Sequence, residues 1–208
     1  PPQRTVTVTG TGKVTLTPDI AYISIGVHSQ NASAKDAVTE NNASAQAVIA
    51  AIKGFGVADK DIQTTNFSIY PQQQYDKDGH IIGILYMVDN TVYVTVRDLS
   101  KLGDLLDASV RSGANSISSI QFDVSDKTQA LSQARLAAVA DARKQADELT
   151  SATGATLGEV QTISYYDTTP PVTMELARAD AGVPAPSVPV AAGSMQITTT
   201  VTIVYALK

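Results

Sequence analysis

The stretch DKTQALSQARLAAVADARKQADELTSATG, which runs from Asp126 to Gly154, is the longest uninterrupted helical pattern in this chain of 208 residues. Its small and apolar residues recur at spacings of three and four, so a helix would present them on one face. These residues are Leu131, Ala134, Ala138, Ala142, Ala146 and Leu149. The opposite face would be polar, with Gln133, Asp141, Lys144, Glu148 and Ser151.

Both ends of this stretch carry residues that are typical of helix termini. Asp126 is suited to cap the first turn, and Gln129 three positions later completes a pattern like a capping box. Gly154 supplies the left-handed residue that commonly ends a helix. A helix of about 27 residues is roughly 40 Å long. Because so long a face needs a wide partner, we expect a sheet to cover it.

The rest of the chain alternates between strand and helix patterns. Alternation of apolar and polar residues predicts strands at 5–16, 21–27, 62–70, 82–96, 117–124, 160–165 and 197–207. Spacings of three and four predict helices at 33–54, with Ser33 as the N-cap, and at 99–112. Gly10-Thr11-Gly12 interrupts the first strand, which predicts either a tight hairpin or a bulged bend there.

The order strand, helix, strand, strand occurs twice, which indicates a pseudo-repeat. The two copies span residues 13–97 and 116–207 and are joined by the helix at 99–112. Gly56 stands five residues before Asp61-Ile62-Gln63-Thr64, and Gly154 stands five before Glu159-Val160-Gln161-Thr162. We therefore predict a single α+β domain over residues 1–208. Its two βαββ units would form antiparallel sheet with the helices packed on one face.

The composition excludes several classes of protein. Charged residues make up 17% of the chain and the net charge is −5, with lysine and arginine scattered singly. This balance argues against a nucleic-acid groove and against a polybasic membrane patch. Apolar runs stay well short of the 18 residues that a transmembrane helix needs, so we expect no transmembrane segment.

The chain has no cysteine, which excludes disulfides, thiolate metal sites and a cysteine nucleophile. This absence leans toward an exported protein that needs no thiol chemistry. The chain begins Pro1-Pro2-Gln3, without a methionine or an apolar leader. It therefore reads as a mature form from which a signal peptide was removed, or as an arbitrary boundary.

Two short motifs suggest ligands but lack essential parts. Gly10-Thr11-Gly12-Lys13 lacks the spacing of a phosphate-binding loop and no helix follows it, so a bent strand explains it better. Asp76-Lys77-Asp78-Gly79 resembles the opening of a calcium loop. Its third acidic position and distal glutamate are missing, so a solvated hairpin tip within 72–80 is the better interpretation.

Catalytic residues are not evident in the sequence. The two histidines, His28 and His80, are more than fifty residues apart, and surface positions explain them better than a metal site or an acid/base pair. Asp19 after Pro18 is typical of a turn. Neither a serine–histidine–aspartate set nor an HExxH motif stands out. The sequence therefore predicts no catalytic residue, no metal ligand and no cofactor.

Two features favour contacts with other molecules. Tyrosines gather on or beside the predicted hairpin strands, and tyrosine is favoured at interfaces. They are Tyr70, Tyr75, Tyr86, Tyr93, Tyr165 and Tyr166. The Pro- and Ala-rich loop at 167–194 is long for a connection between neighbouring strands. It is either a mobile loop or an arm that swaps onto a neighbouring subunit.

Ordered motifs across nearly the whole chain resemble those of SIMPL-domain proteins, the YggE-like group of exported bacterial proteins. Val6 to Gly12 followed by Pro18-Asp19-Ile20-Ala21 resembles the family's VxGxGxxxxxPDxA opening. Residues 61–64 with Tyr70-Pro71 are similar to its DIQT region. Further matches are residues 102–107, 113–115, 134–135, 137–139, Ala142 and 201–207. The loops at 72–80 and 167–194 show no such match.

The resemblance implies a periplasmic or secreted protein that self-associates, sometimes into rings, with a loose link to stress tolerance and antigenicity. It supplies no catalytic residue and no cofactor. Our first hypothesis is therefore a non-enzymatic, self-assembling extracytoplasmic protein, a homo-oligomer whose envelope-associated partner is unknown. The alternative is a binding module for a small molecule or an envelope component, for which we expect a deep tyrosine-lined pocket. A hydrolase with an unrecognised site is a third, weaker hypothesis.

Overall fold

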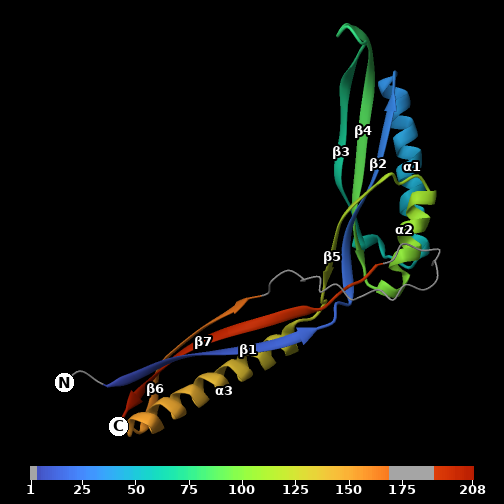
Figure 1. Ribbon diagram of the computed structural model, residues 1–208. Coiled ribbons are helices and arrows are strands. Elements are labelled where there is room, and N and C mark those ends of the chain that lie inside the picture. Colours follow the sequence, from blue (N-terminus) through green and yellow to red (C-terminus); the bar gives the residue numbers. More distant parts are fainter. Residues whose placement is uncertain (1–3, 169–189) are drawn as a thin grey trace, which may run out of the picture. The chain divides into compact units, whose positions relative to one another are not determined.

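The structure is a computed structural model that describes residues 4–168 and 190–208. The described chain divides into two compact units (Figure 1). The three-stranded unit contains residues 4–18, 124–168 and 192–208. The four-stranded unit contains residues 19–123 together with 190 and 191.

The three-stranded unit is an antiparallel sheet with one long helix on it. The strand order is β1 (Thr5–Leu16), β7 (Met195–Leu207) and β6 (Leu157–Thr168). The helix α3 (Thr128–Thr153) lies along β1 and β7 (Figure 1). The expected partner of the alanine-rich helix is therefore confirmed as a sheet.

The buried face of α3 is narrower than the sequence predicted. Its buried residues recur every four positions, at Ala130, Ala134, Ala138, Ala142, Ala146 and Thr150. The prediction of Leu149 on this face is wrong, since its side chain is 50% exposed, and Leu131 is only partly buried. The reason lies in β1, where Gly10 and Gly12 face the helix. A Cβ on either residue would penetrate the carbonyl oxygen of Ala138 or Ala134, so only small residues fit this contact.

The glycines do not interrupt β1, which corrects the predicted hairpin or bulge. β1 pairs with β7 in one unbroken register from Thr5↔Ala206 to Leu16↔Met195. The predicted end of α3 at Gly154 is confirmed, whereas its N-cap residue is Lys127 and not the predicted Asp126. The Asp126 carboxylate accepts the Thr128 N–H at 2.8 Å, and the helix ends at Gly154 with a φ of 69°. The glycine pattern in β1 thus reflects a close helix contact rather than a turn.

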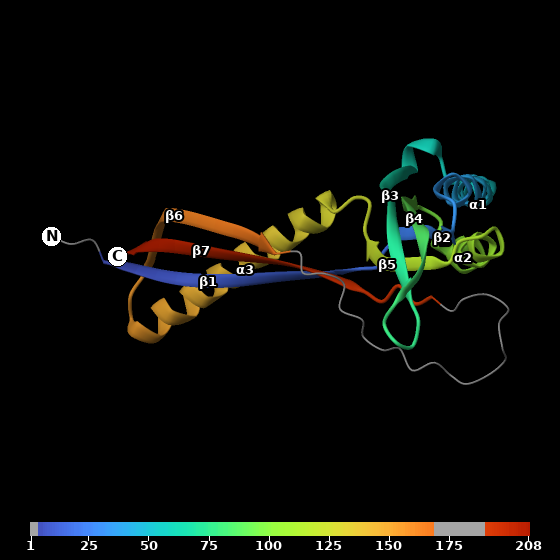
Figure 2. The same ribbon diagram turned by 90° about the horizontal axis from the view of Figure 1, so that it is seen from above.

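The four-stranded unit is also antiparallel, with helices on one face of its sheet (Figure 2). The strand order is β3 (Ile62–Tyr75), β4 (Ile81–Val96), β2 (Ile20–Asn31) and β5 (Ser116–Asp123). The helix α1 (Ala34–Gly54) contacts β2 and β4, and α2 (Leu102–Arg111) packs beside α1. The core side chains are large: Ile23, Ile25, Val48, Ile52, Val88, Val94, Leu102, Leu105 and Leu106.

The N-cap residue predicted for α1 is confirmed by the structure. The Ser33 side chain caps the helix by accepting the Asp36 N–H at 3.4 Å. Asn41, within the buried stripe, donates its amide to the carbonyl oxygens of Val27 at 2.9 Å and Val88 at 3.2 Å. The helix is thereby joined to β2 and β4 by hydrogen bonds as well as by apolar contact.

The predicted α+β class, with antiparallel sheet and helices, is confirmed. One strand assignment differs. The strand predicted to open the second βαββ unit, at 117–124, is β5, which pairs with β2 in the four-stranded sheet. β1 takes the place beside β7 instead. Alternation identifies a strand but not its neighbour, because pairing is decided by contacts distant in sequence. The pseudo-repeat stays a prediction, and most of the 167–194 loop lies outside the described residues.

Candidate interaction surface

The β3–β4 hairpin continues beyond the sheet that supports it. β3 and β4 pair from Ile62↔Val94 to Tyr75↔Ile81, whereas β2 reaches only the Asn31↔Tyr86 pair. Residues 72–85 therefore form a ribbon of two strands that extends past the end of β2 (Figure 1). A two-stranded ribbon alone is marginally stable in water, so this segment gains from any surface that covers it.

Apolar side chains follow the helix-side face of this hairpin. Ile69 is in register with Val88, which is fully buried under α1, so the alternation of both strands places neighbouring residues on that face. Three of them are exposed, Phe67 by 51%, Ile69 by 42% and Ile84 by 46%, and Ile82, at the register shift next to them, is exposed by 65%. These four residues are termed the apolar stripe. Contiguous exposed apolar side chains commonly mark sites of protein contact.

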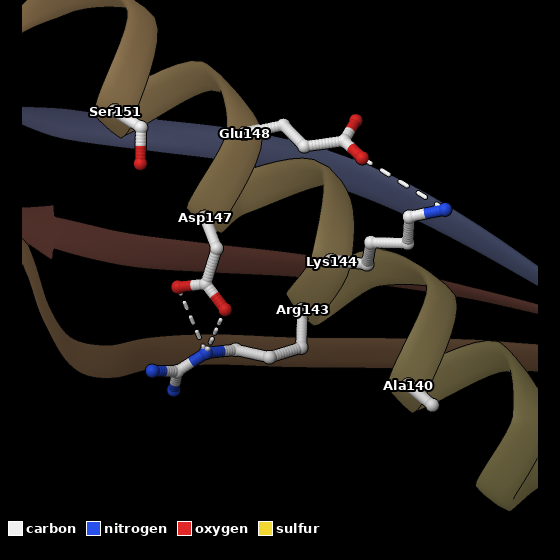
Figure 3. A pocket seen from close by; sticks show the side chains of 6 residues that line it. All are labelled: Ala140, Arg143, Lys144, Asp147, Glu148 and Ser151. Carbon is white, nitrogen blue, oxygen red and sulfur yellow. Dashed lines mark hydrogen bonds and ion pairs between the residues drawn. The ribbon is translucent and has the colours of Figure 1, made fainter.

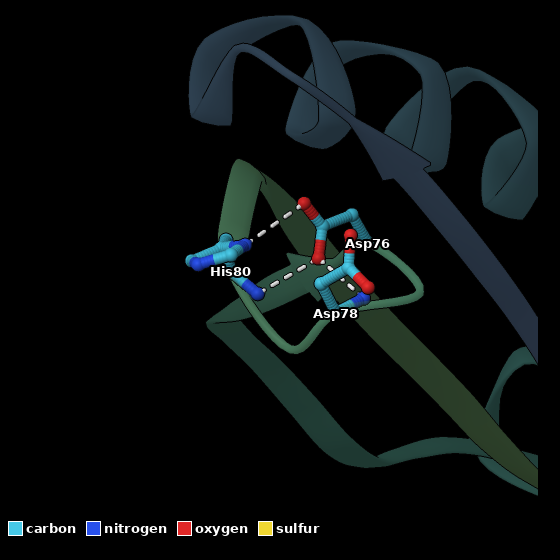
Figure 4. Close-up of side chains that lie close together, drawn as sticks. All are labelled: Asp76, Asp78 and His80. Atoms are coloured by element: carbon cyan, nitrogen blue, oxygen red, sulfur yellow. Dashed lines mark hydrogen bonds and ion pairs between the residues drawn. The ribbon is translucent and has the colours of Figure 1, made fainter.

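The tip of the hairpin is an acidic turn between β3 and β4. The Asp76 Oδ1 accepts the backbone N–H of Asp78 at 2.9 Å and of His80 at 2.8 Å (Figure 4). Several hydrogen bonds hold the pKa of Asp76 below its usual value, and the one from the His80 backbone N–H contributes most. Gly79 takes the positive φ of 84° that the turn requires. The predicted hairpin tip is confirmed, with its turn at 76–80.

This turn also brings together three groups that can ligate a metal. Potential ligand atoms of Asp76, Asp78 and His80 lie within 4.8 Å of one another, and all three side chains are exposed (Figure 4). Two carboxylates and an imidazole suit a divalent cation. The oxygens of Asp76 are already occupied by hydrogen bonds from the turn, so the arrangement is explained as turn chemistry. Sequence reasoning considered the aspartates and His80 separately and did not group them.

The two histidines have separate carboxylate partners. His28, on β2, places its Nδ1 2.6 Å from Asp89 Oδ1, whereas the His80 Nδ1 lies 3.3 Å from Asp76 Oδ2. The Asn115 side chain brackets the His28 backbone, accepting its N–H and donating to its carbonyl oxygen, both at 2.7 Å. These contacts fix His28 in the sheet.

The predicted tyrosines fall on two surfaces. Tyr70 and Tyr75 are exposed on β3, while Tyr86 and Tyr93 are half-buried on β4. Tyr93 stacks on Tyr22 with ring centroids 5.7 Å apart, and burial raises the pKa of its hydroxyl. Tyr165 and Tyr166 belong to β6 in the other unit, with 59% and 65% exposure. The tyrosines therefore do not form one cluster.

Hollows in the described surface are less promising as ligand sites. One on α3 is lined by Ala140, Arg143, Lys144, Asp147, Glu148 and Ser151, all from one helix (Figure 3). Its charges pair within the helix, Arg143 with Asp147 and Lys144 with Glu148, as on an ordinary solvated face. A better enclosed hollow, of about 210 Å³, lies beside Phe55, Asp61, Arg97, Lys101 and Leu105.

The charges of this smaller hollow are already paired. Arg97 donates from Nε at 3.0 Å and from Nη2 at 2.8 Å to the two oxygens of the buried Asp61. This two-point pairing holds the pKa of Asp61 below its usual value and raises that of Arg97. The pair joins the start of β3 to the end of β4, so its evident role is structural.

Comparison with known proteins places the chain in a family. Residues 6–205 match the model of SIMPL, described as a protein of unknown function (DUF541). The chain belongs to the SIMPL family. The resemblance seen in the ordered sequence motifs is thereby confirmed across nearly the whole SIMPL chain.

Relatives of this SIMPL protein come from several bacteria. The 26 kDa periplasmic immunogenic protein of Brucella melitensis is 34% identical over 98% of this chain and 84% of its own length. The uncharacterized protein YggE of Escherichia coli K12 is 35% identical over 77% of this chain and 65% of its own length. YggE of Edwardsiella ictaluri is 34% identical over a similar span. The described helices of the present chain are too short or too polar to cross a membrane.

Proposed function

We propose that this SIMPL protein is a non-enzymatic extracytoplasmic protein that self-assembles through the apolar stripe of the β3–β4 hairpin. The supporting observation is the ribbon at 72–85, which continues the sheet without a third strand while Phe67, Ile69, Ile82 and Ile84 stay exposed. A second copy that covers these side chains would remove apolar surface from water and stabilise a ribbon that is marginal alone.

The contact is made by a face of the hairpin rather than by its free edge. β3 is the edge strand of its sheet and contains Pro71, which has no backbone N–H to donate. A proline on an edge strand is a common means of preventing strand addition. The apolar stripe is consequently the part of the hairpin on which a partner can gain the most.

The proposed location is the periplasm. It is supported by the name of the Brucella relative, the 26 kDa periplasmic immunogenic protein, which is similar over 98% of this chain. The family resemblance also suggests a link to stress tolerance. Survival of a deletion strain under peroxide, compared with a strain carrying the gene, tests that link; equal survival would contradict it.

Light scattering after size exclusion tests the assembly. We expect a mass above that of one chain at micromolar concentration, and a shift toward the monomer in Ile82→Ser/Ile84→Ser. The matched control is Leu136→Ser, which removes an equally exposed apolar side chain from α3, 69% exposed, and should leave the mass unchanged. A wild-type protein that stays monomeric would refute the proposal.

A second candidate function is a binding module for a small molecule or an envelope component. The hollow of about 210 Å³ beside Arg97 and Lys101 would suit a small anion that competes with Asp61 for the guanidinium. It is smaller than the roughly 300–1,000 Å³ typical of ligand sites, and tyrosine does not line it. A rise in melting temperature with phosphate or acetate that Arg97→Gln abolishes would favour this candidate.

A further inference from the structure

The two edge strands of the three-stranded sheet, β1 and β6, differ in whether side chains of α3 bind their outer backbone groups. At the β1 edge, the Thr11 N–H donates to Asp141 Oδ2 at 2.8 Å, and the Gln145 Nε2 donates to the Thr9 carbonyl oxygen at 3.0 Å. Both partners are side chains of α3. They occupy two of the backbone groups to which another strand would bind, so this edge is closed to strand addition at its centre.

The β6 edge has no such protection among the described residues. β6 pairs with β7 on one side and has no described strand on the other. From Thr162 to Thr168 it keeps a regular register with β7 and contains no proline, lysine or arginine. Its side chains Ile163, Tyr165 and Tyr166 are 57–65% exposed. Its one charged residue from Thr162 to Thr168, Asp167, is paired with Arg135 of α3. A regular edge without proline or lysine is a template for another strand.

The closed β1 edge limits how copies of this sheet can join. A head-to-tail array would require β6 of one copy to pair with β1 of the next, and the α3 side chains prevent this. Pairing of β6 with β6 of a second copy remains. Such a contact is antiparallel about a two-fold axis perpendicular to the sheet, and that axis keeps both α3 helices on the same face.

The side chains select the register of this pairing. An axis at Ser164 sets Tyr165 opposite Ile163 of the second copy and Tyr166 opposite Thr162, twice each by symmetry. Aromatic side chains paired with β-branched ones across antiparallel strands are favourable. An axis at Tyr165 would instead set Ile163 opposite Asp167, whose carboxylate is held by Arg135 and Thr199. The Arg135 guanidinium also lies 5.2 Å from the Tyr165 ring centre, which orders that ring.

We propose that β6 pairs antiparallel with β6 of a second copy about a two-fold axis at Ser164, which extends the three-stranded sheet to six strands. This contact rests on the proposed self-assembly but uses another surface than the apolar stripe. It gives each copy two different contacts, one isologous through β6 and one through the hairpin. Two contacts per copy allow assemblies larger than a dimer.

The absence of cysteine makes a direct test available, because a single introduced thiol can form a disulfide only between copies. In the full chain, Ser164→Cys places two thiols across the axis. The Cα atoms of directly opposed residues are about 4.5–5.5 Å apart, which is within the Cα separation that a disulfide spans. Thr9→Cys is the matched control, since Thr9 and Ser164 both flank Thr202 but lie on opposite edges. We expect Ser164→Cys to give at least five times more covalent dimer after mild oxidation.

The outcomes separate this contact from the assembly itself. Absence of a Ser164→Cys dimer, or as much dimer from Thr9→Cys, overturns the β6 pairing while light scattering still shows an oligomer. A monomer in light scattering overturns both proposals. Adding Ile163→Lys to Ser164→Cys should reduce the dimer at least fivefold, because it sets a charge opposite Tyr165; circular dichroism of this exposed variant checks that it folds.

Discussion

The two units bring a helix onto a sheet in opposite ways. In the three-stranded unit, α3 lies on β1 with alanines against Gly10 and Gly12, so backbone nearly touches backbone. In the four-stranded unit, α1 is separated from β2 and β4 by large side chains such as Val48 and Ile52. The contact of α3 with β1 is possible only because the residues there lack larger side chains. The contact of α1 with β2 and β4 depends on how well large side chains fill the space between helix and sheet.

This difference indicates where each unit is vulnerable. A core of large side chains can adjust its rotamers around a change, whereas a backbone-to-backbone contact has no side chain to move. We expect substitutions that add atoms to damage the three-stranded unit most. Hydrogen exchange reports on each unit separately, because protection can be read at α3 and at α1.

The largest effect is expected for Gly12→Ala, which adds one methyl group. Its Cβ would overlap the Ala134 carbonyl oxygen and approach the Ala138 nitrogen, so α3 must move away from β1. We expect the free energy of unfolding to fall by about 3 kcal/mol or more. Hydrogen exchange should show protection lost in α3 and kept in α1.

The control for this substitution is Gly54→Ala at the end of α1, where no atom lies within 4 Å of the added Cβ. Removing a glycine from a helix should leave stability unchanged or raise it by about 0.5–1 kcal/mol. Equal losses in both variants would mean that glycine freedom, rather than the close contact, explains Gly12.

The next largest effect is expected for Ala138→Leu, at the centre of the α3 face. Ala138 is fully buried against Val8 and Val201, so three added carbons should overpack the contact and cost about 1–3 kcal/mol in urea denaturation. Val139→Leu changes the next residue, which is 42% exposed, and should shift stability by less than about 0.5 kcal/mol. A neutral Ala138→Leu would show that α3 is not pressed onto the sheet.

A smaller effect is expected in the four-stranded unit for Arg97→Gln, which leaves the buried Asp61 carboxylate without its partner. We expect a loss of about 1–2 kcal/mol at pH 7. Because Arg97 lowers the folded pKa of Asp61, its stabilisation is present above the unfolded pKa of about 3.9 and is lost as pH falls through the folded pKa.

The pH dependence distinguishes this pair from a surface pair. The difference between wild type and Arg97→Gln should shrink as urea denaturation is repeated from pH 7 toward pH 3. Arg143→Gln breaks the exposed pair with Asp147 and should cost less than about 0.5 kcal/mol at any pH. A difference for Arg97→Gln that stays constant down to pH 3 would contradict the assignment.

The smallest effect is expected for Ser33→Ala at the start of α1. The Ser33 hydroxyl accepts the Asp36 N–H at 3.4 Å, a long hydrogen bond, so its loss should cost about 0.5–1 kcal/mol. Ser33→Asp keeps an acceptor and should retain wild-type stability in the same denaturation experiment. A larger loss than that of Ala138→Leu would reverse the order of vulnerability of the two units.

The candidate surface was predictable in part. Alternation in 62–70 and 82–96 indicated the hairpin strands, and the turn residues Asp76 to Gly79 marked its tip. The apolar stripe was not predictable, because the alternating sequence pattern of a strand is the same whether its apolar face is buried or exposed to solvent. The end of β2 at Asn31 leaves residues 72–85 without a third strand, and strand length relative to a neighbour is a property of the assembled sheet.

By itself, the sequence determined the α+β class, the long alanine helix, the capping by Ser33 and Gly154 and the SIMPL family motifs, since each depends on residues close in the chain. Only the tertiary structure decided that β5 joins β2, that β1 lies beside β7 and that Gly10 and Gly12 receive α3. It also decided that α3 closes the β1 edge and leaves β6 open. These features join residues ninety or more positions apart, and no local pattern specifies which distant backbone a strand or helix will meet.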